Sequence, residues 1–153
     1  MKKIFLIAGL TVASLIGISQ TQVSNKSRSE ILNDEYTSGL FKTAHGTIFD
    51  MENENAQAYF NILDWLEGRV AGLQVFVSRN GARIPVIRGS VATIFVDEMR
   101  MDATFLNSIS TSDIAMIKVI KGPFAGGVGN SGGGAIAIYT LKGEEEEEEE
   151  DGD

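Results

Sequence analysis

The sequence contains no cysteine and only one histidine, His45. Without cysteine the chain can form neither a disulfide nor a thiolate metal site, and it lacks the residue that lipoprotein anchoring requires. A single histidine without cysteine gives little support for a transition-metal site. No segment has the spaced acidic residues of a calcium loop. We therefore expect no metal ion.

Positive charge is also scarce, with 13 Lys and Arg against 21 Asp and Glu, and a net charge of −8. Nucleic-acid binding needs a basic stripe, which is absent, so we expect no nucleic-acid partner. Nine of the acidic residues lie in 144–153, which leaves the rest of the chain nearly neutral. This acidic tail has two interpretations: a disordered, solvated segment, or a docking tail for a basic patch on a partner.

Only the beginning of the chain carries a long apolar run. Lys2 and Lys3 precede an apolar core at 4–18, and the small residues of 17–19 form a cleavage site before Gln20, as in a secretory signal peptide. The core is short for a membrane span, which needs about 20 residues, and no later segment is apolar enough. We expect a signal peptide at 1–19 and a mature protein outside the cytoplasm with no membrane span of its own.

After a polar stretch at 20–43, which we expect to be a flexible N-terminal arm, the sequence has the pattern of one small domain. Apolar residues at spacings of three and four predict a helix from Asp50 to Glu67 that Gly68 ends. Short β-type runs separated by Gly, Asn and Ser follow at Leu73–Val77, Pro85–Arg88, Ala92–Val96, Ile114–Ile120 and Ala135–Thr140. Several of these runs are apolar on consecutive positions, which predicts strands covered on both faces. The pattern predicts an α+β domain over 44–143 with one or two helices and a mixed sheet of about four or five short strands.

The glycine-rich run at 122–134 invites two phosphate-binding interpretations. Gly127, Gly129 and Gly132 have the spacing of a dinucleotide fingerprint, but that motif needs a helix after the glycines, and a strand is predicted here. A P-loop would end in Gly-Lys-Ser or Gly-Lys-Thr, which is missing. We therefore expect no cofactor.

The same run also matches a serine nucleophile motif, with Ser131 between Gly129 and Gly133. An α/β-hydrolase needs its histidine after the serine, and His45 comes before it. A chymotrypsin-like enzyme, which could use His45 with Asp64 or Asp97, needs two β-barrels and more residues than this chain has. We expect the protein not to be an enzyme.

Several segments between Ile62 and Gly143 together resemble the plug domain of TonB-dependent outer-membrane receptors, most of all the nutrient importers of Bacteroidetes-type bacteria. They are Leu66–Val75, Ile87–Gly89, Ile94–Asp97, Asp113–Pro123 and the glycine-rich run into Ala135–Tyr139. Two departures from the family pattern stand out. The family's Val-Asp-Gly turn is Val96-Asp97-Glu98 here, and its Tyr-Gly-Ser-Arg-Gly-like segment is replaced by Val128–Gly133 without the tyrosine or the arginine.

The resemblance implies contacts with the wall of a β-barrel. Arg88 is the first candidate, because this position faces the barrel in the family and a guanidinium pairs bidentately with a carboxylate; an ordinary salt bridge within the domain is the alternative. The full set of expected partner-binding residues is Arg69, Arg88, Gly89, Asp97, Lys121, Gly122, Asn130 and Ser131.

In the receptor family the barrel follows the plug in the same chain. A barrel of about 22 strands, with roughly 9 to 11 residues per strand, needs more than the 153 residues present. The resemblance therefore implies a stand-alone plug in the periplasm that occludes a large outer-membrane β-barrel in trans. The translocon of the type 9 secretion system, a very large barrel with a separate plug protein, resembles what this sequence would need. The alternative is an accessory subunit or remnant of a TonB-dependent nutrient importer.

Overall fold

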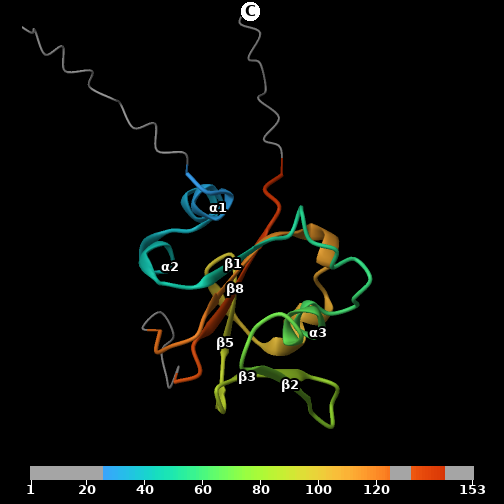
Figure 1. Cartoon of the computed structure of the whole chain (residues 1–153). Helices are drawn as coiled ribbons and strands as arrows, with labels where there is room; N and C mark the ends of the chain where they lie inside the picture. Colours follow the sequence, from blue (N-terminus) through green and yellow to red (C-terminus); the bar gives the residue numbers. More distant parts are fainter. Residues whose placement is uncertain (1–25, 125–131, 144–153) are drawn as a thin grey trace, which may run out of the picture.

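A mixed five-stranded sheet forms the centre of the protein (Figure 1). The computed structural model describes residues 26–124 and 132–143; the expected signal peptide and acidic tail lie outside these ranges. The strand order is β1-β7-β8-β5-β6, and the only parallel pair among these neighbours is β5 with β8. The strands are β1 (Thr47–Asp50), β5 (Thr93–Val96), β6 (Met99–Met101), β7 (Ile114–Ile120) and β8 (Ala135–Thr140).

A smaller antiparallel sheet, in the order β2-β3-β4, lies beyond helix α3 at the lower end of the molecule in Figure 1. Its strands are β2 (Leu73–Val77), β3 (Arg83–Ile87) and β4 (Ser90–Val91), and α3 spans Ile62–Glu67. Two 3-10 helices, η1 (Ala103–Asn107) and η2 (Thr111–Asp113), connect β6 to β7. The predicted α+β class and the mixed sheet are confirmed.

All five predicted strands are present, and three of them, β2, β7 and β8, have the predicted ends. The sequence analysis missed β1, β4 and β6. These strands have only two to four residues, which is too short for a period-two pattern to stand out.

The predicted helix over Asp50–Glu67 is wrong in its first two thirds. Asp50 ends β1, turns follow, and the helix begins only after Asn61, whose side-chain Oδ1 accepts a 2.9 Å hydrogen bond from the Leu63 amide. Residues 51–60 include Asn53 and Asn55, and asparagine favours turns over helix interiors. The predicted end at Gly68 is confirmed.

The expected flexible arm is also corrected, because residues 26–43 contain two helices, α1 (Arg28–Tyr36) and α2 (Gly39–Thr43). A capping box starts α1: the Ser27 hydroxyl accepts from the Glu30 amide, and the Glu30 carboxylate accepts from the Ser27 amide. This is the Ser-x-x-Glu signature of a helix N-terminus, which the sequence shows but its polar composition obscured. We call residues 26–43 the helical arm.

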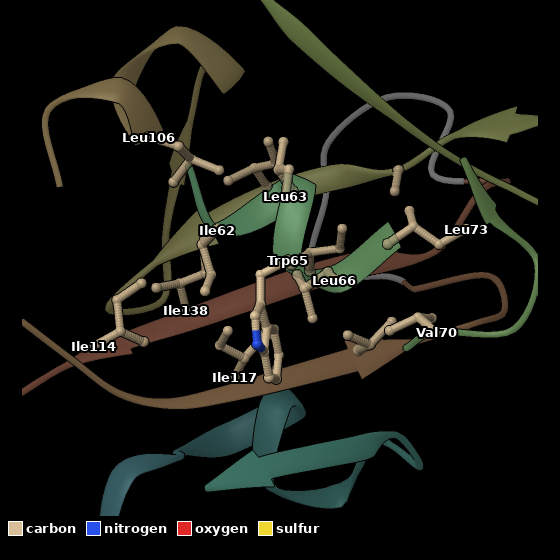
Figure 2. Packing of buried hydrophobic residues seen from close by; sticks show 14 of the residues in the cluster. Ile62, Leu63, Trp65, Leu66, Val70, Leu73, Leu106, Ile114, Ile117 and Ile138 are labelled. Atoms are coloured by element: carbon tan, nitrogen blue, oxygen red, sulfur yellow. The ribbon is translucent and has the colours of Figure 1, made fainter. Parts of the chain in front are cut away.

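The face of the five-stranded sheet that α3 covers contains the larger apolar core. Figure 2 shows Trp65 and Leu66 of α3 pointing toward Ile117 on β7. Trp65, Leu63 and Leu66 are fully buried, and the Phe49 ring packs edge-on against Trp65 with 5.5 Å between ring centroids. α3 is therefore held by burial of one apolar face.

The helical arm covers the other face of this sheet. Leu32 and Phe41 of the arm join a second apolar cluster with Phe95, Phe124 and Met116. The Phe41 ring lies 5.0 Å from that of Phe95 and 4.9 Å from that of Phe124. β7 and β8 are thus covered on both faces, as their consecutive apolar residues predicted.

Lys118 on β7 lies on the face that the helical arm covers. It is only 2% exposed, and its Nζ donates hydrogen bonds to Asn33 Oδ1 (2.6 Å) and to the Phe41 carbonyl oxygen (2.5 Å), both in the helical arm. The sequence analysis did not predict the helices of the arm that covers this face.

Candidate functional site

One end of the molecule gathers four of the six expected partner-binding residues that the structure describes. It consists of the Arg88–Gly89 turn, Lys121–Gly122 and Gly132–Gly134, and we call it the glycine end. A Cβ added to Gly133 would lie 2.3 Å from the Ser90 carbonyl oxygen, and one added to Gly134 would lie 1.9 Å from the Ile120 carbonyl oxygen. The glycines therefore allow the chain entering β8 to pass directly over the start of β4 and the end of β7, and this close packing explains them without a bound phosphate.

Arg88 occupies an exposed turn at this end. Arg88 (φ 52°) and Gly89 (φ 82°) both have left-handed backbone conformations, as a two-residue type I′ hairpin between β3 and β4 requires. Within the described residues the Arg88 guanidinium has no hydrogen-bond or ion-pair partner. The internal salt bridge considered as an alternative is therefore not formed with any described residue.

Lys121 and Gly122 follow β7 and are partly exposed. Two further candidates, Asn130 and Ser131, directly precede Gly132 in the sequence and lie outside the described residues. The structure thus brings Arg88, Gly89, Lys121 and Gly122 to one end.

Asp97 does not belong to the glycine end, because it follows β5 at the opposite end of that strand. Its carboxylate accepts hydrogen bonds from the Thr140 amide and hydroxyl, each 2.9 Å long. These bonds tie the β5–β6 turn to the end of β8. Asp97 thus has a structural role within the domain.

Glu98 replaces the glycine of the family's turn, yet it keeps the left-handed conformation with φ 66°. Its carboxylate accepts from the Ser38 amide (2.5 Å) and from the Ser38 hydroxyl. These bonds fasten the helical arm to the β5–β6 turn, which offsets the backbone cost of a non-glycine residue there. Sequence reasoning saw only the missing glycine.

Arg69 is likewise used within the domain. Its Nη1 donates a 2.9 Å hydrogen bond to the Trp65 carbonyl oxygen, and its guanidinium stacks on the Trp65 ring at 4.3 Å from the centroid. A cation–π contact of this kind holds the side chain against α3. Arg69 is therefore a weaker candidate for partner contact than Arg88.

The residues of the rejected enzyme hypothesis do not assemble in the described part of the chain. Asp64 accepts from Arg83 Nε at 2.7 and 2.8 Å, Asp97 is bound to Thr140, and His45 is exposed. No hydrogen bond joins His45 to either acid in the described ranges. β8 begins directly after the glycine-rich run, where a dinucleotide site would need a helix.

No three His, Asp or Glu side chains in 26–124 and 132–143 converge as a metal site would require. None of the helices in these ranges has the length and apolarity that crossing a bilayer demands.

The family model of the TonB-dependent receptor plug domain matches residues 43–136, more than half of the chain. The chain belongs to this family. Plug domains of TonB-dependent receptors are components of transport systems and not enzymes. No curated protein matches the sequence significantly.

Solved structures of outer-membrane transporters share the fold. The RagAB peptide importer in its closed-closed state matches with a TM-score of 0.54 and 22% identity over 66% of this chain. The siderophore receptor PirA from Acinetobacter baumannii matches with a TM-score of 0.51 and 24% identity over 63% of it. A mutant ferric enterobactin receptor, PfeA, from Pseudomonas aeruginosa matches with a TM-score of 0.53 and 20% identity over 72%.

The match spans only a small part of each transporter: 12% of the RagAB chain, 17% of PirA and 18% of PfeA. What this chain shares with them is the plug fold. Nearly all of the helical arm, up to Lys42, lies before the part that matches the family model.

Proposed function

We propose that this plug domain sits on the periplasmic side of the outer membrane and occludes a large β-barrel that a separate chain supplies. Membership of the plug family supports the barrel partner.

The observation that carries the proposal is the exposed Arg88 on the β3–β4 turn. A guanidinium without a partner among the described residues is available for a bidentate contact with a carboxylate, and the lumen of an outer-membrane barrel is polar. Gly89 and the close-packed Gly132–Gly134 hold this turn in place. Arg88 would thus contact the barrel wall from a fixed backbone.

A wide barrel without a plug would let small molecules leak, and a plug that binds reversibly closes it when no cargo passes. We propose a channel for large cargo as the partner, and the translocon of the type 9 secretion system is the candidate of that kind. The expected signal peptide at 1–19 would direct the plug to the periplasm.

The alternative is that the chain is an accessory subunit or remnant of a TonB-dependent nutrient importer. The observation that favours it is the structural match to the RagAB peptide importer. In that case the partner barrel already has a plug, and this chain seats beside it or binds substrate with its exposed loops.

Affinity purification separates the two proposals. The full chain is tagged after Asp153, purified from detergent-solubilised outer membranes and analysed by mass spectrometry. Recovery of a stoichiometric large barrel that lacks its own plug supports occlusion in trans. Recovery with a plug-containing importer supports the alternative, and recovery of the chain alone contradicts both.

A further inference from the structure

The small sheet has an apolar pattern that its surroundings do not explain. β2 carries Val75, Phe76 and Val77 in succession, and β3 carries Ile84, Pro85, Val86 and Ile87. An antiparallel sheet with one face in water normally alternates apolar and polar residues, whereas consecutive apolar residues mark strands covered on both faces. β7 and β8 have the same pattern and are covered by α3 and the helical arm.

Only one face of the small sheet is covered by described residues. Leu73, Pro85 and Ile87 point to the covered face and are buried. The register places Phe76 opposite Ile84, and Val86 between Gln74 and Val91, so these five side chains, of which only Gln74 is polar, share the other face. We call them the outer face: Phe76 is 53% exposed, Val91 is 58% exposed, and Ile84 and Val86 are half-buried.

The outer face extends into a groove and ends in positive charge. Ile84 and Val91 also line a cavity of about 270 Å³ against Met101 and Ala103. Arg79 lies in the turn after β2 and Arg88 in the turn after β3, both exposed, and neither guanidinium has a partner among the described residues. A complementary surface would be apolar in its centre, with carboxylates at both ends.

The undescribed segments have few side chains with which to cover this face. Once the expected signal peptide is removed, 20–25, 125–131 and 144–153 contain Val23 and Val128 as their only large apolar residues. These segments therefore supply little apolar cover, and a partner protein and a second copy of this chain are the two sources to compare. A second copy would place the arginines of the two outer faces near one another, which disfavours self-association.

We propose that the outer face is the surface by which the plug seats against its partner barrel, and that the barrel presents there an apolar strip flanked by carboxylates. This inference rests on the proposed function. It extends the predicted Arg88 contact, because Arg88 directly follows β3, the strand that carries Ile84 and Val86. It also gives the barrel a recognisable feature, since lumens are otherwise polar.

Substitutions on the outer face test the inference in the affinity purification described above. Phe76→Ser removes the largest side chain of the face, and Phe60→Ser is the matched control, because Phe60 is 76% exposed and lies outside the face. We expect Phe76→Ser to lower barrel recovery at least about tenfold, the effect of losing one buried aromatic contact, and Phe60→Ser to leave it unchanged. Because Phe76 is half-exposed, both variants should unfold at nearly the wild-type denaturant concentration.

Cross-linking locates the contact directly. The chain has no cysteine, so Phe76→Cys and Phe60→Cys each carry one thiol for a benzophenone label. Irradiation of the purified complex should join position 76, and not position 60, to the barrel. A cross-link from position 76 to a second copy, or equal barrel recovery with Phe76→Ser, overturns the inference and leaves the proposed function intact. If the wild-type chain recovers no barrel, the result contradicts both the proposed function and this inference.

Discussion

The ammonium group of Lys118 on β7 donates a 2.6 Å hydrogen bond to Oδ1 of Asn33 on α1. Its second acceptor is the Phe41 carbonyl oxygen, so both partners belong to the helical arm. No carboxylate in the described residues pairs with this ammonium. The arm therefore does two things at once: it covers an apolar face and satisfies a buried cation.

Removing one of these partners should destabilise the domain. Asn33→Ala leaves the buried Lys118 ammonium with only the Phe41 carbonyl, and a lost hydrogen bond to a buried charged group costs about 1 to 3 kcal/mol. Denaturant unfolding followed by circular dichroism measures the change. Asn55→Ala is the matched control, because Asn55 is exposed and its side chain has no hydrogen bond in the described residues. Equal stability of the two variants would mean that the arm does not hold Lys118 in solution.

The Lys118 contact should also have a pH dependence. Burial lowers the pKa of the Lys118 ammonium below its ordinary value of 10.5, so the folded state disfavours the charged form. Between the folded and the unfolded pKa the unfolded chain binds more protons, and stability rises with pH. The cost of burying the charge is present in full below the folded pKa and disappears above the unfolded one.

Lys118→Met removes this titration. The free energy of unfolding of Lys118→Met should therefore exceed that of the wild type by the largest amount near neutral pH. This difference should shrink as pH rises toward the ordinary lysine pKa. Unfolding of both proteins at a series of pH values up to about 10.5 measures the difference, in which the other titrating groups cancel. A difference that does not vary with pH would contradict the burial of a charged Lys118.

Asp34 should contribute stability that is lost in acid. Its carboxylate lies 2.6 Å from Lys26 Nζ and 2.9 Å from Lys42 Nζ, and these contacts lower its pKa from 3.8 to about 2. A lowered carboxyl pKa contributes stability above the unfolded value, which is lost as pH falls through the folded value. The wild type should thus be more stable than Asp34→Asn above pH 4, and the difference should vanish near pH 2. A constant difference over this range would show that the ion pairs do not form.

The glycine end should tolerate substitution least where the backbone comes closest. Gly134 and Gly81 have nearly the same positive φ, 82° and 80°, but an added Cβ meets the Ile120 carbonyl oxygen at 1.9 Å at Gly134 and nothing within 4 Å at Gly81. Gly81→Ala should therefore cost only the left-handed conformation, about 1 to 2 kcal/mol, and Gly134→Ala distinctly more. Thermal unfolding ranks the two variants, and the reverse order would contradict the close packing of β8 on Ile120.

Prediction from the sequence was most accurate for strands whose residues are apolar at nearly every position. The apolar runs of β7 and β8 were predicted with the correct first and last residues. The predicted helix over Asp50–Glu67 was too long, because the three-and-four spacing that holds for Ile62, Leu63 and Leu66 was extended back over residues that form turns.

The parts that sequence reasoning missed depend on tertiary context. The sequence contains the capping-box motif at Ser27. However, α1 buries only Leu32, so no apolar periodicity indicated a helix there. Nothing in the local sequence around Lys118 indicates that the helical arm packs over it. Of the candidate site, Arg88 was found in an exposed turn, whereas Asp97 and Arg69 proved to have partners that only the fold brings near.

The occlusion proposal depends most directly on whether Arg88 seats the plug in a barrel. Outer membranes of cells producing tagged wild type, Arg88→Ala or Arg88→Lys are solubilised, and the large barrel recovered with each is quantified. We predict stoichiometric recovery with the wild type, a strong loss with Arg88→Ala, and partial recovery with Arg88→Lys, which keeps the charge but not the bidentate geometry. Recovery that is equal for all three, or a wild-type plug that brings down no barrel, would contradict the account.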